Sequence, residues 1–377
     1  MKTKYFLFIG MIISLLLSAC GNTSTNKNRE GITHFAYQET ENGKWGIMSV
    51  EGKVVVPSTF QDMPTPVTDD MFFVVREDGT YELHNINEPE KIVGTNYINV
   101  TNFSEGIAFV TRKGESISCI DKNGNTLYQL PQYIKRVSIP TEGIFYAVND
   151  KDKGGYINMQ GKIIIPFQYD AGSPFVNGYA VALKFKEKSA IVIDKNGNKI
   201  TSINADTKES TFDAILSNYI MQEIGVYNDI VPYAADGNFG LKNIHEKALL
   251  PANSQYKAIS RSCGGYCVYQ TSNGYGIMND SGKILIKDKY SVIGSCNTNN
   301  NGMFIASIDD KWGILSMDER QLCPFEYDYI ASLLNSPYFI GIKEQTSFLI
   351  TKTGEIKRQF KQAFFTIDDI VESDILY

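Results

Sequence analysis

The chain has 377 residues, of which 43% are hydrophobic and 12% aromatic, and it carries 36 basic against 42 acidic side chains. This apolar content excludes an intrinsically disordered chain, which lacks the residues needed for a core. The formal net charge of −6 argues against nucleic acid as a partner, because phosphate contacts require a basic face.

Residues 1–19 have the features of a lipoprotein signal peptide. Lys2 and Lys4 form a short basic segment, and an almost wholly apolar run of about 15 residues extends from Tyr5 to Ser18. That run is shorter than the roughly 20 residues that a membrane-spanning helix needs. Leu17-Ser18-Ala19-Cys20 resembles the bacterial lipobox. By that resemblance the mature chain begins at Cys20, with acyl chains such as palmitate on its sulfur and amine; an ordinary secretory peptide with a chance cysteine is the alternative.

Residues 20–31 are predicted to be the lipidated cysteine and a flexible tether. The segment 21–31 has no apolar side chain, and random-coil scaling gives it a reach of about 17–20 Å. Two or three acyl chains make attachment stable, so the membrane is an expected partner. We expect a lipid anchor in the bacterial cell envelope, and in the outer membrane of a Gram-negative cell, which Gly21 after the cysteine fits.

Residues 32–377 are predicted to form an array of about nine copies of one repeat. The segment from Lys44 to Pro57 matches residues 154–166, and the copies start at residues 45, 81, 117, 154, 190, 239, 275, 312 and 347. The steps are 35 to 37 residues long apart from a single step of 49. The residue two positions after each start is apolar: Ile47, Leu83, Cys119, Tyr156, Val192, Leu241, Ile277, Ile314 and Leu349.

Each repeat has the pattern of a small β-meander. The Trp-Gly-Ile-Met-Ser segment alternates, which predicts one buried face, whereas the Val-Val-Val or Ile-Ile-Ile segment is apolar on both faces. A turn such as Asp121-Lys122-Asn123-Gly124 separates the two, and an alternating strand such as 178–183 precedes each start. A third short segment, as in 167–170, follows. Three to four strands in about 36 residues predict an all-β, β-propeller-like fold, with an open β superhelix or solenoid as the alternative.

The step of 49 residues places an insertion near residues 201–238. Phe212, Ile215 and Leu216 recur there at helical spacing, and Ser210 with Asp213 has the spacing of a capping box. The insertion therefore predicts one amphipathic helix of about 13 residues, packed across the array or plugging one end.

The clearest copies share the pattern Trp-Gly-aliphatic, Gly-Lys, three β-branched residues and Pro. This pattern resembles the WG (KWG) repeats of bacterial envelope and secreted proteins, over about residues 32–370, and with the lipobox it identifies a WG-repeat lipoprotein. The resemblance implies a β-propeller-like or superhelical scaffold with no established catalytic activity, and it transfers no functional residue. The signature residues, to which we assign a structural role, are Trp45, Gly46, Gly52, Gly155, Gly161, Gly276, Gly282, Trp312 and Gly313.

Few residues suggest chemistry. His34, His84 and His245 stand in unrelated positions, and there is neither a His-Glu-x-x-His nor a Gly-x-Ser-x-Gly motif. The Asp-Lys-Asn-Gly turns contain only part of a calcium loop, so we expect turns there and no metal. Trp45 and Trp312 could stack on a sugar, but other copies have Tyr or Phe at this position, which favours packing.

Five cysteines follow Cys20: Cys119, Cys263, Cys267, Cys296 and Cys323. Cys263 and Cys267 could form a disulfide if two strands turn at the intervening glycines, whereas Cys119 falls on an apolar position of the repeat and is expected to be buried. The zinc spacing Cys-x-x-Cys is absent from the sequence.

These features predict a non-enzymatic envelope lipoprotein that presents a β-repeat scaffold to a protein or glycan partner and needs no cofactor. One alternative is a carbohydrate-active enzyme with paired carboxylates in a central channel, for which Asp69-Asp70 and Asp309-Asp310 are candidates. The other is a structural spacer without a ligand.

Overall fold

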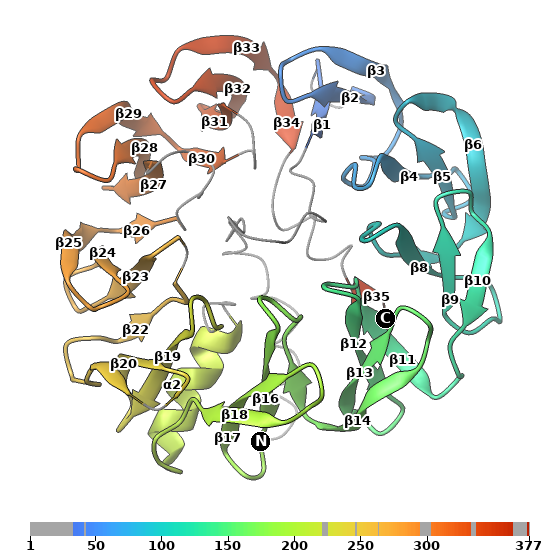
Figure 1. Cartoon of the computed structure of the whole chain (residues 1–377). Helices are drawn as coiled ribbons and strands as arrows, with labels where there is room; N and C mark the ends of the chain where they lie inside the picture. The colour runs from blue at the N-terminus through green and yellow to red at the C-terminus, as the bar shows by residue number, and fades with distance from the viewer. Residues whose placement is uncertain are drawn as a thin grey trace.

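The computed structural model describes residues 33–40, 43–220, 225–245, 247–262, 264–294, 303–332, 337–364 and 375–376. In these ranges the chain forms nine small β-sheets arranged around a common axis, as the blades of a β-propeller (Figure 1). The prediction of a propeller-like all-β fold is thus confirmed. The predicted signal peptide, Cys20 and tether lie outside the described residues.

The strands of each blade are antiparallel neighbours and follow one another outward from the axis. Blade 1 contains β34 (Gln362–Phe364), β1 (His34–Gln38), β2 (Trp45–Ser49) and β3 (Val54–Phe60). Blade 2 contains β4 (Met71–Val75), β5 (Tyr81–Asn85) and β6 (Glu88–Tyr97). Blade 3 contains β7 (Asn99–Val100), β8 (Ile107–Thr111), β9 (Ser118–Asp121) and β10 (Thr126–Gln129). Blade 4 contains β35 (Ile375–Leu376), β11 (Ile134–Ser138), β12 (Ile144–Asn149), β13 (Gly154–Asn158) and β14 (Ile163–Tyr169). Blade 5 contains β15 (Ala171–Gly172), β16 (Tyr179–Lys184), β17 (Ser189–Asp194) and β18 (Lys199–Ser202). Blade 6 contains β19 (Ile230–Ala235), β20 (Asn238–Asn243) and β21 (Ala248–Leu250). Blade 7 contains β22 (Ala258–Ile259), β23 (Tyr266–Gln270), β24 (Tyr275–Asn279) and β25 (Ile284–Tyr290). Blade 8 contains β26 (Val292–Ile293), β27 (Met303–Ile308), β28 (Lys311–Ser316) and β29 (Gln321–Tyr327). Blade 9 contains β30 (Tyr329–Ser332), β31 (Tyr338–Lys343), β32 (Thr346–Thr351) and β33 (Ile356–Phe360).

The ring is closed by a strand from the end of the chain. β34 pairs antiparallel with β1, with Ala36 opposite Phe364 and Gln38 opposite Gln362, and so supplies the inner strand of blade 1. This pairing joins the two ends of the array, and the open superhelix that the sequence left as an alternative is therefore wrong.

The 36-residue pattern corresponds to one strand position in the ring. Every predicted start falls at or within one residue of the beginning of the strand next to the outermost strand of a blade, which is the third strand from the axis in a blade of four. The nine apolar residues two positions later are all buried, each with at most 1% of its surface exposed. The glycines seven positions after a start take up positive φ, as tight turns require: Gly52, Gly124, Gly161, Gly197, Gly282 and Gly354.

The predicted burial of two strands in each repeat is the reverse of what the structure has. In β2 all residues after Trp45 are buried, because the third strand lies between neighbouring blades and is covered on both faces. In β3 only Val56 is buried, because the outermost strand lies where the blades spread apart. The predicted separate segment 167–170 is the end of the outer strand β14.

The glycine of the repeat signature faces a bulge in the outer strand. In blade 4, Gly154 pairs with Tyr169 and Tyr156 with Ile165, so two steps on β13 correspond to four on β14. A Cβ on Gly155 would lie 2.6 Å from the carbonyl oxygen of Ile165. The same close approach recurs at Gly46, Gly240, Gly276 and Gly313. The bulged strand can lie this close only because the facing residue has no side chain.

The insertion contains the helix α2 (Glu209–Ile220). It begins before the predicted cap Ser210, because the chain already turns at Asp206, whose carboxylate accepts the N–H groups of Lys208 and Asp236, both at 2.9 Å. Ile215 is buried in one core cluster with residues of blades 5 and 6.

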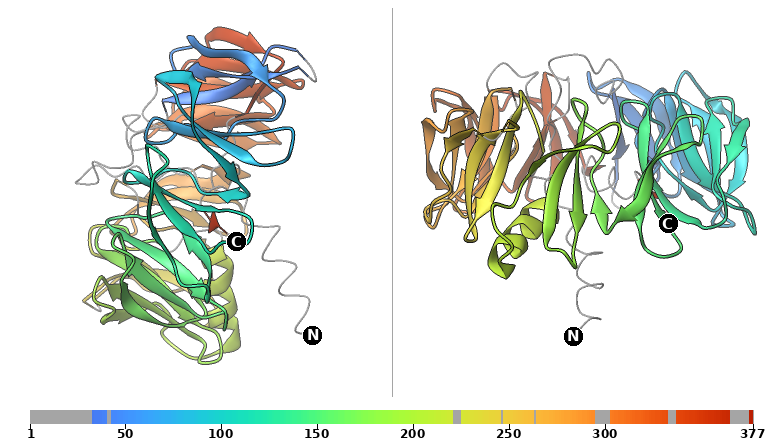
Figure 2. Two further views of the ribbon diagram at one scale, coloured as in Figure 1. Left: turned by 90° about the vertical axis from the view of Figure 1, so that its right-hand side faces the viewer. Right: turned by 60° about the horizontal axis from the view of Figure 1, so that its bottom comes forward.

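The prediction that α2 plugs one end of the array is wrong, because the ring is closed and the helix packs on β17 and β19. The helix lies between blades 5 and 6 (Figures 1 and 2). It stands between β18 and β19 in the chain, where most other blades have a short inner strand. None of the described helical residues form a segment long and apolar enough to cross a membrane.

Candidate functional site

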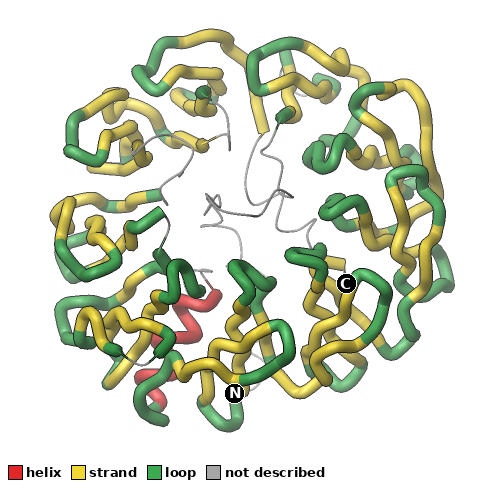
Figure 3. The backbone as a smooth tube through the Cα atoms, viewed as in Figure 1, coloured by secondary structure: helices red, strands yellow, loops and turns green. Residues whose placement is uncertain are grey.

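The turns before β4, β8, β12 and β16 project toward the axis (Figures 1 and 3). Their two central residues both have positive φ: Asp69-Asp70, Glu105-Gly106, Glu142-Gly143 and Asn177-Gly178. Such a hairpin turn normally carries Asn, Asp or Gly at both positions, and glutamate in this conformation is uncommon. We therefore expect the acidic side chains in these turns to make a specific interaction.

That interaction is a hydrogen bond to the next blade. The Asp69 carboxylate accepts the N–H of Gly106 at 2.7 Å, and the Glu105 carboxylate accepts that of Gly143 at 2.8 Å. The Glu142 carboxylate accepts the N–H of Gly178 at 2.9 Å. We call Asp69, Glu105 and Glu142 the carboxylate row, which connects blades 2, 3, 4 and 5 in sequence.

Lysines of the Asp-Lys-Asn-Gly turns lie on the same face of the ring. Lys195 Nζ lies 3.0 Å from a Glu142 carboxylate oxygen, and Lys122 Nζ lies 3.9 Å from Asp70. Turns between the first and second strands and between the third and fourth strands of a blade therefore share one face, which we call the acidic face. Turns between the second and third strands lie on the opposite face, as the alternation of an antiparallel sheet requires.

The Asp-Lys-Asn-Gly turns use their own carboxylates. Asp194 accepts the N–H groups of Asn196 and Asn198 at 2.9 and 2.8 Å. Its partial burial acts to raise the pKa, but these hydrogen bonds outweigh it and hold the pKa of Asp194 below its usual range. Asp121 has the same arrangement and the same direction of pKa shift. These acids shape turns, as the sequence predicted. Within the described ranges, no group of three or more His, Cys, Asp or Glu could hold a metal ion.

A second set of links between blades lies on the opposite face. The Asp328 carboxylate is 2.5 Å from Lys311 Nζ in its own blade and accepts the N–H of Glu344 in the next blade at 2.8 Å. The bond from Lys311 lowers the pKa of Asp328. Asp170 is bound in the same way by Lys153, at 2.5 Å, and by the N–H of Phe185 at 2.7 Å. The Tyr-Asp pair that ends some repeats is thus a joint between blades.

The candidate carboxylates of the enzyme alternative are not brought together. Asp69-Asp70 forms a turn of blade 2 on the acidic face, whereas Asp309-Asp310 forms the turn between β27 and β28 of blade 8 on the opposite face. Asp69 is also engaged by the N–H of Gly106.

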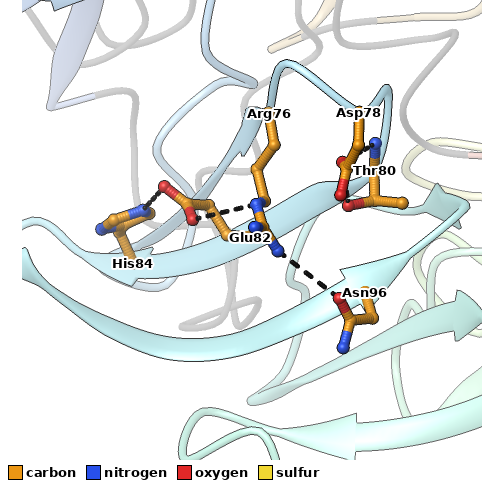
Figure 4. A network of polar contacts seen from close by, with 6 residues as sticks. All are labelled: Arg76, Asp78, Thr80, Glu82, His84 and Asn96. Carbon is orange, nitrogen blue, oxygen red and sulfur yellow. Dashed lines mark hydrogen bonds and ion pairs between the residues drawn. The ribbon is translucent and has the colours of Figure 1, made fainter.

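Figure 4 shows a polar network in blade 2 that contains the one buried histidine among the described residues. His84 Nδ1 lies 2.8 Å from the carbonyl oxygen of Pro89, and Nε2 lies 3.0 Å from a Glu82 carboxylate oxygen. Arg76 Nε lies 3.9 Å from the other Glu82 oxygen.

The His84 ring also joins two blades. It stacks on Phe72 of its own blade at 5.4 Å and lies 6.4 Å from the ring of Phe60 in blade 1. His34 lies on β1 and His245 in the turn after β20, so the three histidines belong to different blades. Burial lowers the pKa of His34.

The other candidates lie in the packing between strands or outside the described residues. Trp312 is half-buried and contacts Tyr329 of the next blade edge-on at 5.3 Å, which supports a packing role. Cys119 is buried, as predicted. Cys267 is buried on β23, and because Cys263 lies outside the described residues the disulfide stays a prediction.

The sequence analysis missed the carboxylate row, although its spacing is regular: Asp69, Glu105 and Glu142 each precede a repeat start by 12 residues. It also missed a row of inner hydroxyls. Thr101 Oγ1 accepts the N–H of Phe109, and Ser138 Oγ that of Tyr146, eight residues later in both cases. These hydroxyls carry no apolar signal, so hydrophobic periodicity cannot detect them.

We expect Glu142→Ala to lower the free energy of unfolding by about 1–3 kcal/mol, since the Gly178 N–H loses its acceptor and Lys195 loses the carboxylate, at a site where the glutamate is only 10% exposed. Urea unfolding followed by circular dichroism measures this. Glu90→Ala on the exposed part of β6 is the matched control and should stay within about 0.5 kcal/mol of the parent protein. Equal effects of the two substitutions would contradict a stabilising role of the carboxylate row.

The comparisons with known proteins agree with this architecture. A family model described as "WG containing repeat" matches residues 45–81, 155–184 and 275–312, spans that begin in β2, β13 and β24 of blades 1, 4 and 7. No curated protein matches the chain. Among solved structures, the chain is similar to a eukaryotic initiation factor, with 8% identity, a TM-score of 0.57, and coverage of 90% of this chain and 98% of that one. It also matches the computationally designed Ika8 protein (11% identity, TM-score 0.44, 87% and 97% covered) and BamB from Moraxella catarrhalis (13%, 0.41, 81% and 94%).

Proposed function

Since this chain is a WG-repeat protein folded as a closed nine-bladed β-propeller, we propose that it is a lipid-anchored lipoprotein of the bacterial cell envelope that binds a protein or glycan partner without catalysis. The anchor rests on Cys20 in the lipobox-like segment Leu17-Ser18-Ala19-Cys20. In a cell with two membranes the anchor lies in the outer membrane.

The observation that supports a scaffold is the use of polar side chains as joints. The carboxylate row, the Lys311–Asp328 pair and the buried His84 each connect a strand or turn to a neighbouring blade. These acids and this histidine would be the first candidates for catalytic residues. In this structure they connect the blades and so stabilise the ring. A stiff ring with loops on two faces is suited to recognition, and this step is an analogy with other repeat proteins.

The path of the chain suggests which face meets the partner. The N–H of Val50, beside the turn from β2 to β3, donates to the carbonyl oxygen of Thr33 at 2.9 Å, so the chain enters blade 1 on the acidic face. A tether reaching about 20 Å would hold that face near the membrane. The opposite face, with the turn that contains Asp309-Asp310, would then point away and receive the partner.

The anchor is tested by Cys20→Ser. We expect the parent protein to incorporate a palmitate analogue and to sediment with membranes, whereas Cys20→Ser carries no label and is soluble, because the thiol that takes the lipid is absent. Labelled Cys20→Ser, or an unlabelled parent protein, would contradict the anchor.

The binding role is tested with soluble Cys20→Ser protein as bait in envelope extract. Lys186→Glu on the turn between β16 and β17 changes the opposite face, and the matched variant Glu51→Lys changes the acidic face; both positions are exposed. Loss of a captured partner with Lys186→Glu alone supports the proposed orientation. A bait that recovers no specific protein or glycan in repeated conditions counts for the spacer.

A further inference from the structure

The signature glycine of blade 7 fixes the direction of one peptide group in β25, the last strand of its sheet. A Cβ on Gly276 would lie 2.5 Å from the carbonyl oxygen of Ile286, so this carbonyl points from β25 toward β24. In a trans peptide the C=O and the N–H point in opposite directions, and the described residues contain no cis peptide bond. The N–H of Lys287 therefore points outward, away from blade 7.

The other blades with this glycine remove that donor. In each of them the carbonyl oxygen that faces the glycine lies 2.4–2.8 Å from the position of a Cβ. The residue that follows this carbonyl is a proline in all four: Pro57, Pro166, Pro251 and Pro324. Proline has no N–H, and on an edge strand it prevents pairing with a further chain. Blade 7 has Lys287 at this position, so its outer edge lacks the protection of the other four.

The side chains that β25 exposes beside this donor change from apolar to basic along the strand. Leu285 is 38% exposed, and Lys287 and Lys289 are also exposed. Burial alternates from Leu285 onward, so these three side chains share one face of the strand. A strand that pairs with this edge should therefore carry an apolar and two acidic residues at the same spacing.

The outer strand of blade 2, β6, has that pattern. Glu88 and Glu90 are exposed on it, and Ile92 is 51% exposed. The carbonyl oxygen of Pro89 lies 2.8 Å from Nδ1 of His84, so the N–H of Glu90, on the other side of the same peptide group, points away from this ring. β6 is also the longest outer strand, with ten residues, whereas the others have three to seven.

One antiparallel register matches both the backbone and the side chains of the two strands. It places Glu90 opposite Lys287, and because the N–H of each points outward, the two residues can exchange two backbone hydrogen bonds. Opposite charges that face each other across two strands stabilise the pairing, as do apolar pairs. The same register gives two further pairs: Glu88 with Lys289, and Ile92 with Leu285.

Two of these side chains already have an ion-pair partner in their own chain. Glu88 lies 3.3 Å from Lys91, and Lys289 lies 2.7 Å from Glu319. Glu88 and Lys289 are 61% and 56% exposed, and exposed ion pairs contribute so little that they exchange partners at small cost. The pair of Glu90 with Lys287 is therefore the one on which the test rests.

We propose that β6 of one copy pairs antiparallel with β25 of a second copy, with Glu90 opposite Lys287, so that the copies associate head to tail. Blades 2 and 7 lie on opposite sides of the ring (Figure 1). Each copy in a pair thus keeps one of the two edges for the next copy, and a contact of this kind extends as an open row. The inference goes beyond the proposed function, because it assigns a second copy as a partner and needs neither the anchor nor another ligand.

The test measures association of soluble Cys20→Ser protein, the parent chain here, by sedimentation velocity at increasing concentration. We expect the parent chain to associate, and Glu90→Lys or Lys287→Glu alone to weaken association by about fivefold or more, because like charges then face each other. The double variant Glu90→Lys/Lys287→Glu should associate like the parent chain, because the pair is restored with its charges exchanged. Lys162→Glu, at an exposed turn of blade 4, is the matched control and should leave association unchanged.

Lys287→Pro tests the backbone donor. β24 and β25 pair with the same register shifts as β13 and β14, where Pro166 stands at this position, so we expect the variant to keep the urea unfolding curve of the parent chain in dilute solution. It should lose association by about tenfold. A parent chain that stays monomeric, a Lys287→Pro chain that associates as the parent does, or a double variant no better than the single variants overturns the inference. Because this assay needs neither lipid nor envelope, its failure is distinct from failure of the proposed function.

Discussion

Gly155→Ala is expected to lower the free energy of unfolding by about 2–3 kcal/mol, at the upper end of the range for overpacking a well-packed site. The added Cβ would lie 2.6 Å from the carbonyl oxygen of Ile165 and 3.0 Å from the amide nitrogen of Phe167. Both atoms belong to the backbone of β14, so no side-chain rotation can relieve the contact. The bulge would have to move away from β13 and disturb the pairing of Tyr156 with Ile165.

The matched control is Gly79→Ala. Gly79 has a φ of +78°, but a Cβ there has no atom within 4 Å, so this variant measures the cost of the left-handed conformation alone, about 1 kcal/mol. Urea unfolding curves with shared slopes give both differences. If Gly155→Ala costs no more than Gly79→Ala, the close approach of the bulge does not explain the Trp-Gly signature.

The repeat could be located in the sequence because it depends on apolar spacing. Ile47, Ile277 and Ile314 mark the buried strand next to the outermost strand of a blade, and the turn glycines mark positive φ. Both requirements are local: the buried apolar residue recurs in all nine copies and the turn glycine in six of them. Counting nine such positions was enough to predict a β-repeat array of the right length.

The burial of each strand could not be predicted in this way, because it depends on the neighbouring blade. Trp45 to Ser49 alternates like a strand with one wet face, yet both faces of β2 are covered once the ring is formed. The hydrogen bonds between blades could not be predicted for the same reason. Nothing in Asp69 or Glu142 alone indicates that its carboxylate accepts an N–H about 37 residues away in sequence.

Ring closure was left open by the sequence because it pairs the two ends of the array. No sequence pattern links residues 362–364 to blade 1 at the other end of the array. Their role as the inner strand of that blade follows from the pairing with β1 alone. The interface that they complete is also held by other contacts. One core cluster contains Phe35 and Tyr37 of blade 1 with Phe360 of blade 9, and Arg358 donates to the Gly52 carbonyl oxygen at 3.1 Å.

A chain that ends at Lys361 is therefore expected to lose about 3 kcal/mol or more of unfolding free energy. Its inner edge of β1 loses three residue pairs with β34, and each backbone hydrogen bond contributes about 0.5–1.5 kcal/mol. The core cluster and Arg358 keep blades 1 and 9 in contact, so we expect local opening in place of complete unfolding. Hydrogen exchange by mass spectrometry should then show faster exchange in β1 than in β2, because β1 has become the edge of its sheet.

The chain that ends at Phe364 is the matched control, since it removes the same C-terminal residues beyond β34 and retains the pairing with β1. It should keep the slow exchange of β1 and most of the unfolding free energy of the parent chain. Equal exchange of β1 in the two truncated chains would show that the core cluster of Phe35, Tyr37 and Phe360 closes the ring without the strand. A difference confined to β1 would show that residues 362–364 close the ring of nine blades.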